Sequence, residues 1–472
     1  MMAPFPDGFV WGVATSAFQV EGALDKDGRG PSIWDRFCRV PGAIANGDIA
    51  DVTADHYHRW LEDVEIMAGL GVRAYRFSIA WPRIQPTGRS PVNAKGMAWY
   101  DRLVDALLER DIAPCPTLYH WDLPAAFDDA GGWLDRSTAE RFGEYSRLCF
   151  DALGDRVGTW FTINEPWVAA TLGYRLGIHA PGRRDLAAAV RASHELLRAH
   201  AAAVEAFRAS GAGARGRIGP VLNLMPTYPA TDSDADREAA VGSDGYTNRW
   251  FLDPILRGAY PADTFELLER LAGPFDWLEP EDLARIGRPV DLVGVNYYAR
   301  RVVTAGRTED GLPWRVVPAT PGIPTTDTGW EITPECLTDL LVRVRTDYGD
   351  VPLLVTENGC VFLDAPDPAG RIADAGRVRF LRDHLAAIRA AIDAGVRVEG
   401  YFAWSLLDNF EWAEGLRSRF GLVHVDYPSG RRLVKDSGHA YARIIAANGI
   451  DQADVAPRAD AVGRPVIAVG GE

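Results

Sequence analysis

The chain has 472 residues, 47% of them hydrophobic, which is enough for a large core and for one (β/α)8 barrel with insertions. Lysine and arginine number 50 against 65 aspartates and glutamates, and the net charge of −15 disfavours nucleic acid and anionic membranes as partners, since both need clustered positive charge. The five cysteines, Cys38, Cys115, Cys149, Cys336 and Cys360, are scattered and odd in number, which indicates reduced thiols in a cytoplasmic protein rather than a disulfide framework.

The N-terminal segment Met1–Asp7 has no basic region and no long apolar stretch, so we do not expect a signal peptide. No apolar run is long enough to span a bilayer. From Phe9 onward, short β-rich runs alternate with amphipathic helical patterns. The eight strands that we predict are Phe9–Val13, Ala74–Ile79, Ala113–Leu118, Thr159–Ile163, Arg217–Leu222, Leu292–Asn296, Leu353–Thr356 and Gly400–Trp404. The helical patterns include His56–Leu70, Met97–Arg110, Thr138–Leu153, Leu186–Ser210 and Asp374–Asp393.

This alternation of strands and helices predicts an α/β fold with parallel strands joined by crossover helices. Eight units favour a single closed (β/α)8 TIM barrel with long βα loops, and an open doubly wound sheet is the structural alternative. We assign residues 1–447 to the barrel domain, and we expect residues 448–472, rich in Ala, Asp, Pro and Gly, to form a weakly ordered C-terminal tail in which Pro465–Val469 could pack locally as a strand. The stretch Thr304–Thr333, rich in Gly, Pro and Thr, is predicted to be a long loop over the pocket mouth.

Polar and aromatic residues gather at the ends of these predicted strands. The active sites of such barrels lie at the C-terminal ends of their strands. Each residue alone is compatible with a cap or a turn, but their joint placement predicts a site. They are Arg76 on the second strand, His120 and Trp121 after the third, Asn164 and Glu165 after the fourth, Asn296 and Tyr298 at the sixth, Glu357 at the seventh and Trp404 at the eighth.

Other chemistries find little support in the sequence. Gly211–Gly216 matches Gly-x-Gly-x-x-Gly, but it follows a helix and precedes a strand, the reverse of a dinucleotide fingerprint. His56 and His58 are two residues apart and point away from each other on a helix, so we expect no metal there. A Schiff-base mechanism needs a lysine in the pocket, and no lysine lies at a predicted strand end. We also find no Gly-x-Ser-x-Gly nucleophile elbow.

Two glutamates share an unusual local frame. Glu165 stands in Thr-Ile-Asn-Glu-Pro and Glu357 in Val-Thr-Glu-Asn-Gly, each at the end of a strand-like run and beside an asparagine. One such glutamate alone is equally consistent with a helix cap or a salt bridge. On the fourth and seventh strands of a barrel, however, the two carboxylates converge across the axis. Paired carboxylates are what acid-catalysed cleavage of a glycosidic bond requires.

At this point the chain resembles glycoside hydrolase family 1, the retaining β-glucosidases. The resemblance extends from Phe5 to about Ala447 and is carried by a set of motifs that together are highly specific. They are Phe9–Gly22, Tyr75–Ser78, Tyr119–Pro124, Thr162–Pro166, His179–Gly182, Val295–Tyr298, Thr356–Gly359 and Tyr401–Trp412.

The resemblance implies a role for each candidate residue. Glu357 is expected to be the nucleophile and Glu165 the acid and base, and Arg76 and Tyr298 would keep Glu357 ionised and oriented. Asn296 would lie near the acid/base and the sugar 2-hydroxyl. The sugar-binding residues are expected to be Gln19, His120, Trp121, Asn164, Trp404, Glu411, Trp412 and Phe420. Trp330, together with His179, would line the side of the leaving group, the aglycone.

Two branches of the family differ from this sequence. Relatives that act on 6-phosphorylated sugars replace the cage glutamate by serine and add a nearby lysine, whereas Glu411 is present here and no lysine follows it. A carboxylate at that place would repel a phosphate. Plant thioglucosidases replace the acid/base by glutamine, whereas Glu165 is retained. We therefore expect cleavage of ordinary O-glycosides.

The resulting prediction is a cytoplasmic, exo-acting, retaining β-glucosidase that also accepts β-galactosides and β-fucosides. It would act on small β-glucosides and β-linked oligosaccharides, as in cellulose degradation, without a metal or a cofactor. A transglycosylase on the same site remains an alternative, and a non-catalytic sugar-binding barrel is disfavoured because both carboxylates are present. The sequence leaves the oligomeric state open, a homo-oligomer included.

Overall fold

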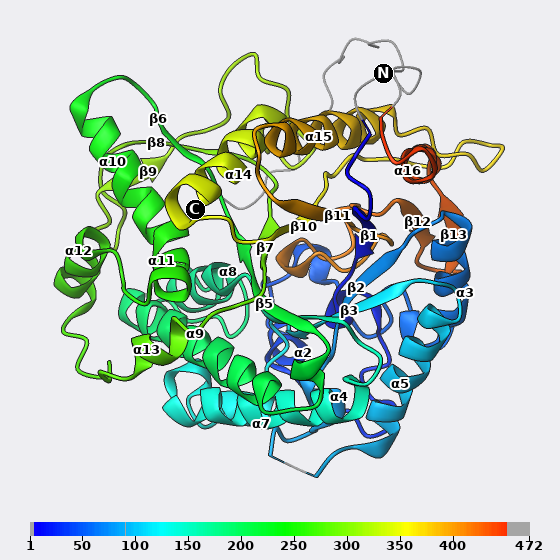
Figure 1. Ribbon diagram of the computed structural model, residues 1–472, viewed down its shortest axis with the longest axis horizontal. Coiled ribbons are helices and arrows are strands. Elements are labelled where there is room, and N and C mark those ends of the chain that lie inside the picture. Colours follow the sequence, from blue (N-terminus) through cyan, green and yellow to red (C-terminus); the bar gives the residue numbers. More distant parts are fainter. Residues whose placement is uncertain (1–3, 90, 451–472) are drawn as a thin grey trace.

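The computed structural model describes residues 4–89 and 91–450, and its centre is a closed barrel of eight parallel strands (Figure 1). The predicted fold class is therefore confirmed, and the doubly wound alternative is wrong. All eight predicted strands exist, and their ends differ from the predicted ones by at most two residues. They are β1 (Val10–Ala14), β2 (Ala74–Ser78), β3 (Ala113–Tyr119), β4 (Thr159–Asn164), β5 (Arg217–Asn223), β7 (Val293–Asn296), β10 (Leu353–Asn358) and β11 (Val398–Trp404).

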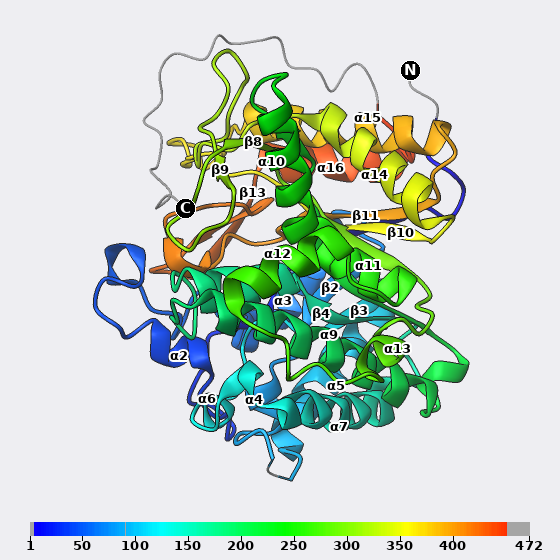
Figure 2. The same ribbon diagram turned by 90° about the vertical axis from the view of Figure 1, so that its left-hand side faces the viewer.

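Helices cover the outside of the barrel (Figures 1 and 2). The long ones are α3 (His56–Gly69), α5 (Ala94–Leu108), α7 (Arg136–Leu153), α9 (Leu186–Arg208), α14 (Pro334–Tyr348), α15 (Ala375–Asp393) and α16 (Asp436–Ala447). The side chains of Asp135 and Asp185 cap the first backbone N–H groups of α7 and α9, which defines where these helices begin. Apolar faces of the helices pack on the strands, and the barrel interior is filled by side chains such as Phe161, Leu354 and Phe402.

Shorter helices lie mostly in the connections that follow the strands. They are α1 (Ala17–Val20), α2 (Ile33–Phe37), α4 (Trp81–Ile84), α6 (Ala125–Asp128), α8 (Pro166–Ala170), α10 (Asp234–Asp244), α11 (Trp250–Arg257), α12 (Ala262–Ala272) and α13 (Asp282–Ile286). Two π-helical segments, Thr171–Arg175 and Gly245–Arg249, continue α8 and α10. The connections thus supply the long βα loops that the sequence predicts.

Two small sheets were not predicted. One joins β6 (Thr227–Pro229), β8 (Arg301–Ala305) and β9 (Trp314–Val316), and the other is the hairpin of β12 (Val423–Asp426) and β13 (Arg431–Val434). The prediction of a long loop over Thr304–Thr333 is therefore wrong in part, because this stretch contains the end of β8 and all of β9. A strand of three residues is too short for an alternating pattern to be recognised in the sequence.

The end of the described chain is attached to its beginning. Trp11 Nε1 donates to Asn448 Oδ1 at 2.9 Å, and Asn448 Nδ2 donates to the Phe5 carbonyl at 2.9 Å. Most of the predicted tail, residues 451–472, lies outside the described residues.

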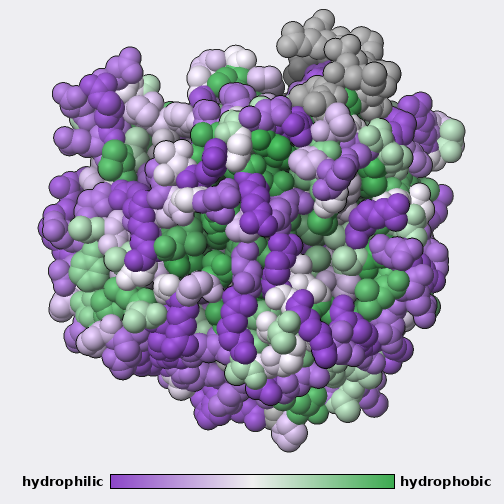
Figure 3. Space-filling model, viewed as in Figure 1, coloured by the Kyte–Doolittle hydropathy of each residue, from purple (hydrophilic) through white to green (hydrophobic). Residues whose placement is uncertain are grey.

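The described surface exposes few large hydrophobic side chains. They are scattered along the chain, and on the face seen in Figure 3 the hydrophobic areas are interrupted by hydrophilic residues. Within residues 4–89 and 91–450, no helix combines the length and apolarity needed to cross a membrane. All five cysteines are buried as free thiols.

Candidate active site

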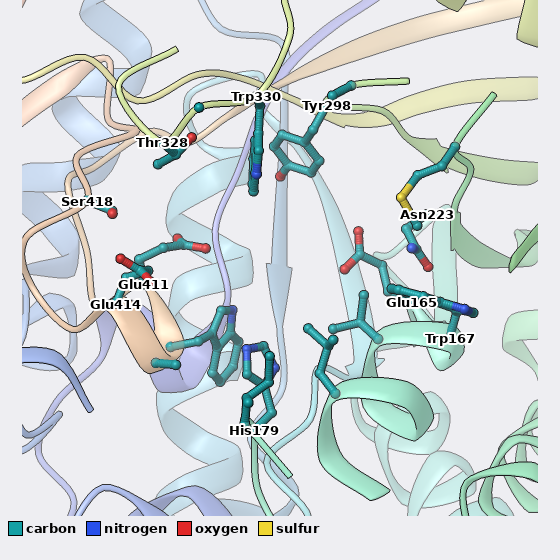
Figure 4. A pocket seen from close by; sticks show the side chains of 18 of the residues that line it. Glu165, Trp167, His179, Asn223, Tyr298, Thr328, Trp330, Glu411, Glu414 and Ser418 are labelled. Atoms are coloured by element: carbon teal, nitrogen blue, oxygen red, sulfur yellow. The ribbon is translucent and has the colours of Figure 1, made fainter. Parts of the chain in front are cut away.

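The strand ends open into a cavity of about 1070 Å³. Of the predicted site residues, all but Arg76, Gln19 and Asn164 line it, and these three are buried directly behind the lining. In Figure 4, Glu165 and Glu411 extend into the cavity from opposite sides, with Tyr298 and Trp330 above and His179 below. Residues from seven of the eight strand–loop units thus meet in one place. Asn223, at the end of β5, also lines the cavity; the rule applied to the other strand ends would have identified it.

Glu357 lies at the end of β10, where it receives two hydrogen bonds. Arg76 Nη1 donates to Glu357 Oε1 at 2.5 Å, and the Tyr298 hydroxyl donates to Glu357 Oε2 at 2.7 Å. Both bonds favour the charged form of the carboxylate, the first by direct Coulomb attraction as well. They also fix the plane of the carboxylate, so that each oxygen points in a defined direction.

Arg76 is fully buried in β2 and is itself held by several acceptors. Its Nη2 donates to Asn164 Oδ1 at 2.6 Å, and its Nε donates to Thr117 Oγ1 at 3.1 Å. A buried guanidinium needs partners for all of its N–H groups. The side chain of Asn164 is therefore occupied by Arg76 on one side, and its Nδ2 lies 3.1 Å from His120 Nε2 on the other. This explains why Asn164 lies behind the cavity wall rather than on it.

Glu165 follows β4 in a left-handed backbone conformation, with φ of 48°, just before the proline that begins α8. Such a φ is uncommon for a residue other than glycine and concentrates at functional sites. Here the turn brings the carboxyl group into the cavity. Asn296 Nδ2 donates to Glu165 Oε1 at 2.8 Å, and Thr356 Oγ1 fixes Asn296 by donating to its Oδ1 at 2.8 Å. The other oxygen of Glu165 remains available for a proton.

Glu165 and Glu357 lie three strand positions apart, with β5 and β7 between their strands. Burial raises the pKa of Glu165, and the negative charge of Glu357 raises it further, to about 8. Arg76 contacts Glu357 and not Glu165, and with its raised pKa Glu165 is the group expected to carry a proton near neutral pH.

This asymmetry makes a prediction about pH. If Glu165 must be protonated to act, kcat/KM on β-glucosides is full below its pKa and falls as the pH rises through about 8. Replacing Glu357 by Gln removes the charge and should lower the pKa of Glu165. The pH profile of kcat/KM and a ¹³C NMR titration of the glutamate carboxyls in the E357Q variant measure both effects. An alkaline limb far below 8, or an unchanged Glu165 pKa in E357Q, would contradict this assignment.

Glu411 is a third buried carboxylate, on the segment after β11. Gln19 Nε2 donates to Glu411 Oε2 at 3.2 Å and to Asn409 Oδ1 at 3.0 Å. Burial, followed by the charges of Glu357 and Glu165, places the pKa of Glu411 well above its ordinary value. The bonds to Glu411, to Asn409 and from Ser16 Oγ keep Gln19 behind the wall. Hydrogen-bond acceptors and donors that are held in place in this way can bind several hydroxyl groups of one ligand.

Aromatic rings enclose the same space. Trp404 and Trp412 each stack on His120, with centroids 6.0 Å apart, and Trp121 lies 4.5 Å from Trp412. Tyr298, Trp330 and Phe420 form a second group with centroid distances of 5.4–6.1 Å. Burial and the nearby Arg76 charge hold the pKa of His120 well below its usual range, so its ring is neutral. Flat apolar faces beside fixed polar groups match the two kinds of surface that a sugar ring presents.

A buried ion pair supports the segment after β11 from behind. Lys435 Nζ lies 3.0 Å from Asp408 Oδ1, and neither side chain is exposed. Asp408 also accepts from the Gly421 backbone N–H at 3.0 Å and from Arg419 Nη1 at 2.8 Å. A fully bonded buried pair of this kind restricts the loop to one arrangement. The segment that it supports carries Trp404, Glu411, Trp412 and Phe420. No motif in the sequence indicates this role of Lys435.

No group of three His, Cys, Asp or Glu side chains that could hold a metal ion occurs among the residues that the structure describes.

The chain is similar to known proteins over nearly its whole length. The model of the family described as glycosyl hydrolase family 1 matches residues 1–450. Beta-glucosidase A of Thermotoga maritima is 46% identical over 448 residues, which cover 95% of this chain and 99% of that protein. A bifunctional beta-D-glucosidase/beta-D-fucosidase of Bifidobacterium breve is 44% identical and covers 94% and 98% of the two chains. The structure of the AHE enzyme from Alicyclobacillus herbarius has a TM-score of 0.91 at 47% identity, covering 95% and 100%. The family 1 b-glucosidase of T. maritima in complex with isofagomine lactam has a TM-score of 0.89 at 45% identity, covering 95% and 99%.

Proposed function

The chain belongs to glycosyl hydrolase family 1, and on that basis we propose that it removes the terminal, non-reducing β-D-glucosyl residue of β-glucosides with Glu357 as nucleophile and Glu165 as acid and base. The family retains the configuration of the anomeric carbon, and the enzyme is an O-glycosidase. The observation that carries the assignment of roles is the unequal environment of the two carboxyl groups. Arg76 and Tyr298 both donate to Glu357, whereas Glu165 has a raised pKa and only an amide donor.

In the first step, an oxygen of Glu357 attacks the anomeric carbon while Glu165 donates its proton to the glycosidic oxygen. The bond from the anomeric carbon to that oxygen breaks, and the aglycone leaves as a neutral alcohol. Protonation is needed because an alkoxide is a poor leaving group. The product of this step is a glycosyl ester of Glu357.

In the second step, the same groups act in reverse. The ester has no negative charge, so the repulsion that raises the pKa of Glu165 is lost and Glu165 becomes a carboxylate. It then removes a proton from a water molecule, which attacks the anomeric carbon and releases Glu357. Arg76 and Tyr298 stabilise the carboxylate as it leaves. Two inversions at one carbon give retention.

The bound sugar would occupy the end of the cavity that is formed by Glu411, Trp412, His120 and Trp404. Gln19 and Asn164 would position these residues from behind or bind the sugar beside them. The Bifidobacterium breve relative is named for glucosidase and fucosidase activities, which supports acceptance of β-fucosides here. β-Galactosides are proposed on the same site. The buried carboxyl group of Glu411 accepts a hydrogen bond from Gln19 and offers no positive charge to a 6-phosphate, which supports unphosphorylated sugars as the substrates.

We further propose that the enzyme is cytoplasmic and acts on small β-glucosides and β-linked oligosaccharides, including those released in cellulose degradation. Transfer of the glucosyl group to a second sugar is the alternative outcome of the same intermediate. The five buried free thiols are consistent with a reducing compartment. The oligomeric state, for which a homo-oligomer is one option, is measurable by sedimentation.

A 2-deoxy-2-fluoro-β-glucoside with an acidic leaving group tests the proposed nucleophile. The fluorine destabilises the positive charge that develops in both steps, while the good leaving group keeps the first step fast, so the ester on Glu357 should accumulate. We expect time-dependent inactivation and a single labelled peptide that contains Glu357, identified by mass spectrometry. A competitive inhibitor that binds the same site should slow the inactivation. Labelling of another residue, or hydrolysis without inactivation, would refute the assignment.

A further inference from the structure

The part of the cavity next to Glu165 is lined mainly by aliphatic side chains. Val168 on α8, Leu172 on the π-helical segment after it and Met225 after β5 all line it. Its outer edge is formed by two segments from distant parts of the chain, residues 40–45 and 316–319. Val40 and Val316 are 51% and 45% exposed, so apolar surface continues to the opening. Figure 4 shows Trp167 and Asn223 on this same side, beside Glu165.

This part of the cavity faces the leaving group if the proposed function holds. Glu165 gives its proton to the glycosidic oxygen, so the aglycone must leave from the Glu165 side. The polar sugar-binding candidates Glu411 and His120 belong to the other end. The aliphatic surface therefore meets the aglycone and not the glucosyl ring.

Several charged side chains that line the cavity are bonded to other groups of the protein. Arg300 Nε donates to Glu331 Oε2 at 2.5 Å. On the opposite side of the cavity from Glu165, beside Glu411, Glu414 accepts from Arg417 Nε at 2.6 Å. Arg301 donates to Thr247 Oγ1 at 2.9 Å, and its guanidinium lies 4.9 Å from the centroid of the Trp167 ring.

The remaining polar groups are few and mostly neutral. Burial lowers the pKa of His179 to about 3, so its ring is uncharged. Thr328 shares a hydrogen bond with Thr326 at 2.8 Å. Asn223 is a neutral amide on the lining, and Arg184 lines the cavity where it is exposed to solvent.

From this lining we propose that the enzyme selects uncharged, apolar aglycones, alkyl or aryl, in preference to a second sugar. Hydroxyl groups of a second sugar would lose water and meet aliphatic walls, whereas methylene groups would gain by leaving water. The volume of about 1070 Å³ leaves room for such a group beyond the glucosyl ring. This inference narrows the substrate range of the proposed function and depends on it.

The test is kcat/KM for a series of n-alkyl β-glucosides from ethyl to octyl, below their micelle concentrations, with cellobiose alongside. The primary alcohols are nearly equal in acidity, so differences along the series report binding of the chain and not chemistry. We expect kcat/KM to rise about two- to fourfold per methylene until the chain reaches the opening, and octyl glucoside to exceed cellobiose. A flat series, or cellobiose as the better substrate, would overturn the proposal.

A matched pair of variants locates the effect. Val168→Thr exchanges a lining methyl for a hydroxyl of nearly the same size, and should lower the octyl-to-ethyl ratio of kcat/KM about three- to tenfold. Val241→Thr makes the same exchange on α10, where the side chain is 57% exposed and away from the cavity, and should leave that ratio unchanged. A ratio that is unchanged in Val168→Thr would overturn the assignment of this wall to the aglycone.

A separate measurement tests the proposed function itself. Release of 4-nitrophenol from its β-glucoside shows whether the enzyme is a β-glucosidase at all. Hydrolysis of that substrate with a flat alkyl series rejects the apolar aglycone site alone. No hydrolysis of any β-glucoside by the folded protein rejects both.

Discussion

Replacing Glu357 by Ala is expected to lower kcat on aryl β-glucosides by about four orders of magnitude or more, because no covalent intermediate can form. Losses of this size are typical when a nucleophile is removed from a catalytic unit. Glu165 is intact in this variant, but an aryl leaving group needs little help from an acid. Glu165 should therefore not compensate for the loss of the nucleophile. Initial rates with 2,4-dinitrophenyl β-glucoside measure the loss over the widest range.

The variant also offers a positive test. Removing Glu357 leaves Arg76 buried beside an empty space and without its carboxylate partner, which favours binding of a small anion there. Azide or formate in that space would attack the anomeric carbon from the face that Glu357 used. We expect partial rescue of aryl glucoside cleavage and, with azide, a glucosyl azide of the α configuration. Rescue with a β product, or near-normal activity without added anion, would contradict the role of Glu357.

Folding of the variant must be checked, because a buried charge without its partner is costly. Circular dichroism and a thermal melt serve this purpose, and the fluorescence of the tryptophans around the cavity reports local packing. A melting temperature that recovers when formate is added would support the view that the anion binds beside Arg76.

The sequence was sufficient for the barrel and for the main groups of the site. Its eight strands are short, mostly buried runs separated by long amphipathic helices. This pattern can be recognised in the sequence without knowing which residues are in contact. The polar residues at strand ends were found because a closed barrel brings all of its C-terminal strand ends together. Asn223 meets the same criterion and was overlooked.

Other features depend on contacts between distant segments, which a single sequence does not reveal. The aliphatic wall combines Val40, Val168, Met225 and Val316, each unremarkable in its own segment. Lys435 is one lysine near the end of the chain, and its link to Asp408 exists only in the folded protein. Gln19 and Asn164 were assigned to the sugar cage from their motifs, while their hydrogen-bond partners place them one layer back. Their contact with substrate stays a prediction.

Replacing Glu165 by Ala should divide substrates by the acidity of their leaving group. For alkyl β-glucosides, kcat/KM should fall about a thousandfold to ten-thousandfold, because general acid catalysis contributes about 10²–10⁴ and alkoxides leave poorly. For 2,4-dinitrophenyl β-glucoside, whose phenol leaves without a proton, the fall should be less than about tenfold. Comparison of the two kcat/KM values in one preparation cancels any loss of folded protein. Equal losses would show that Glu165 is not the acid.

Two further readouts separate loss of the acid from a general disturbance of the site. The alkaline limb of the pH profile near 8 is assigned to Glu165, so it should be absent from kcat/KM of the variant on the activated substrate. The second step should also be slow, because no base activates water, and the glucosyl ester on Glu357 should accumulate. Azide, which needs no base, would then attack the ester through the space left by Glu165 and give a β-glucosyl azide. Azide therefore gives opposite anomers in the two alanine variants, because it enters from the face on which the carboxylate has been removed. The same anomer from both variants would mean that the two roles are wrongly assigned.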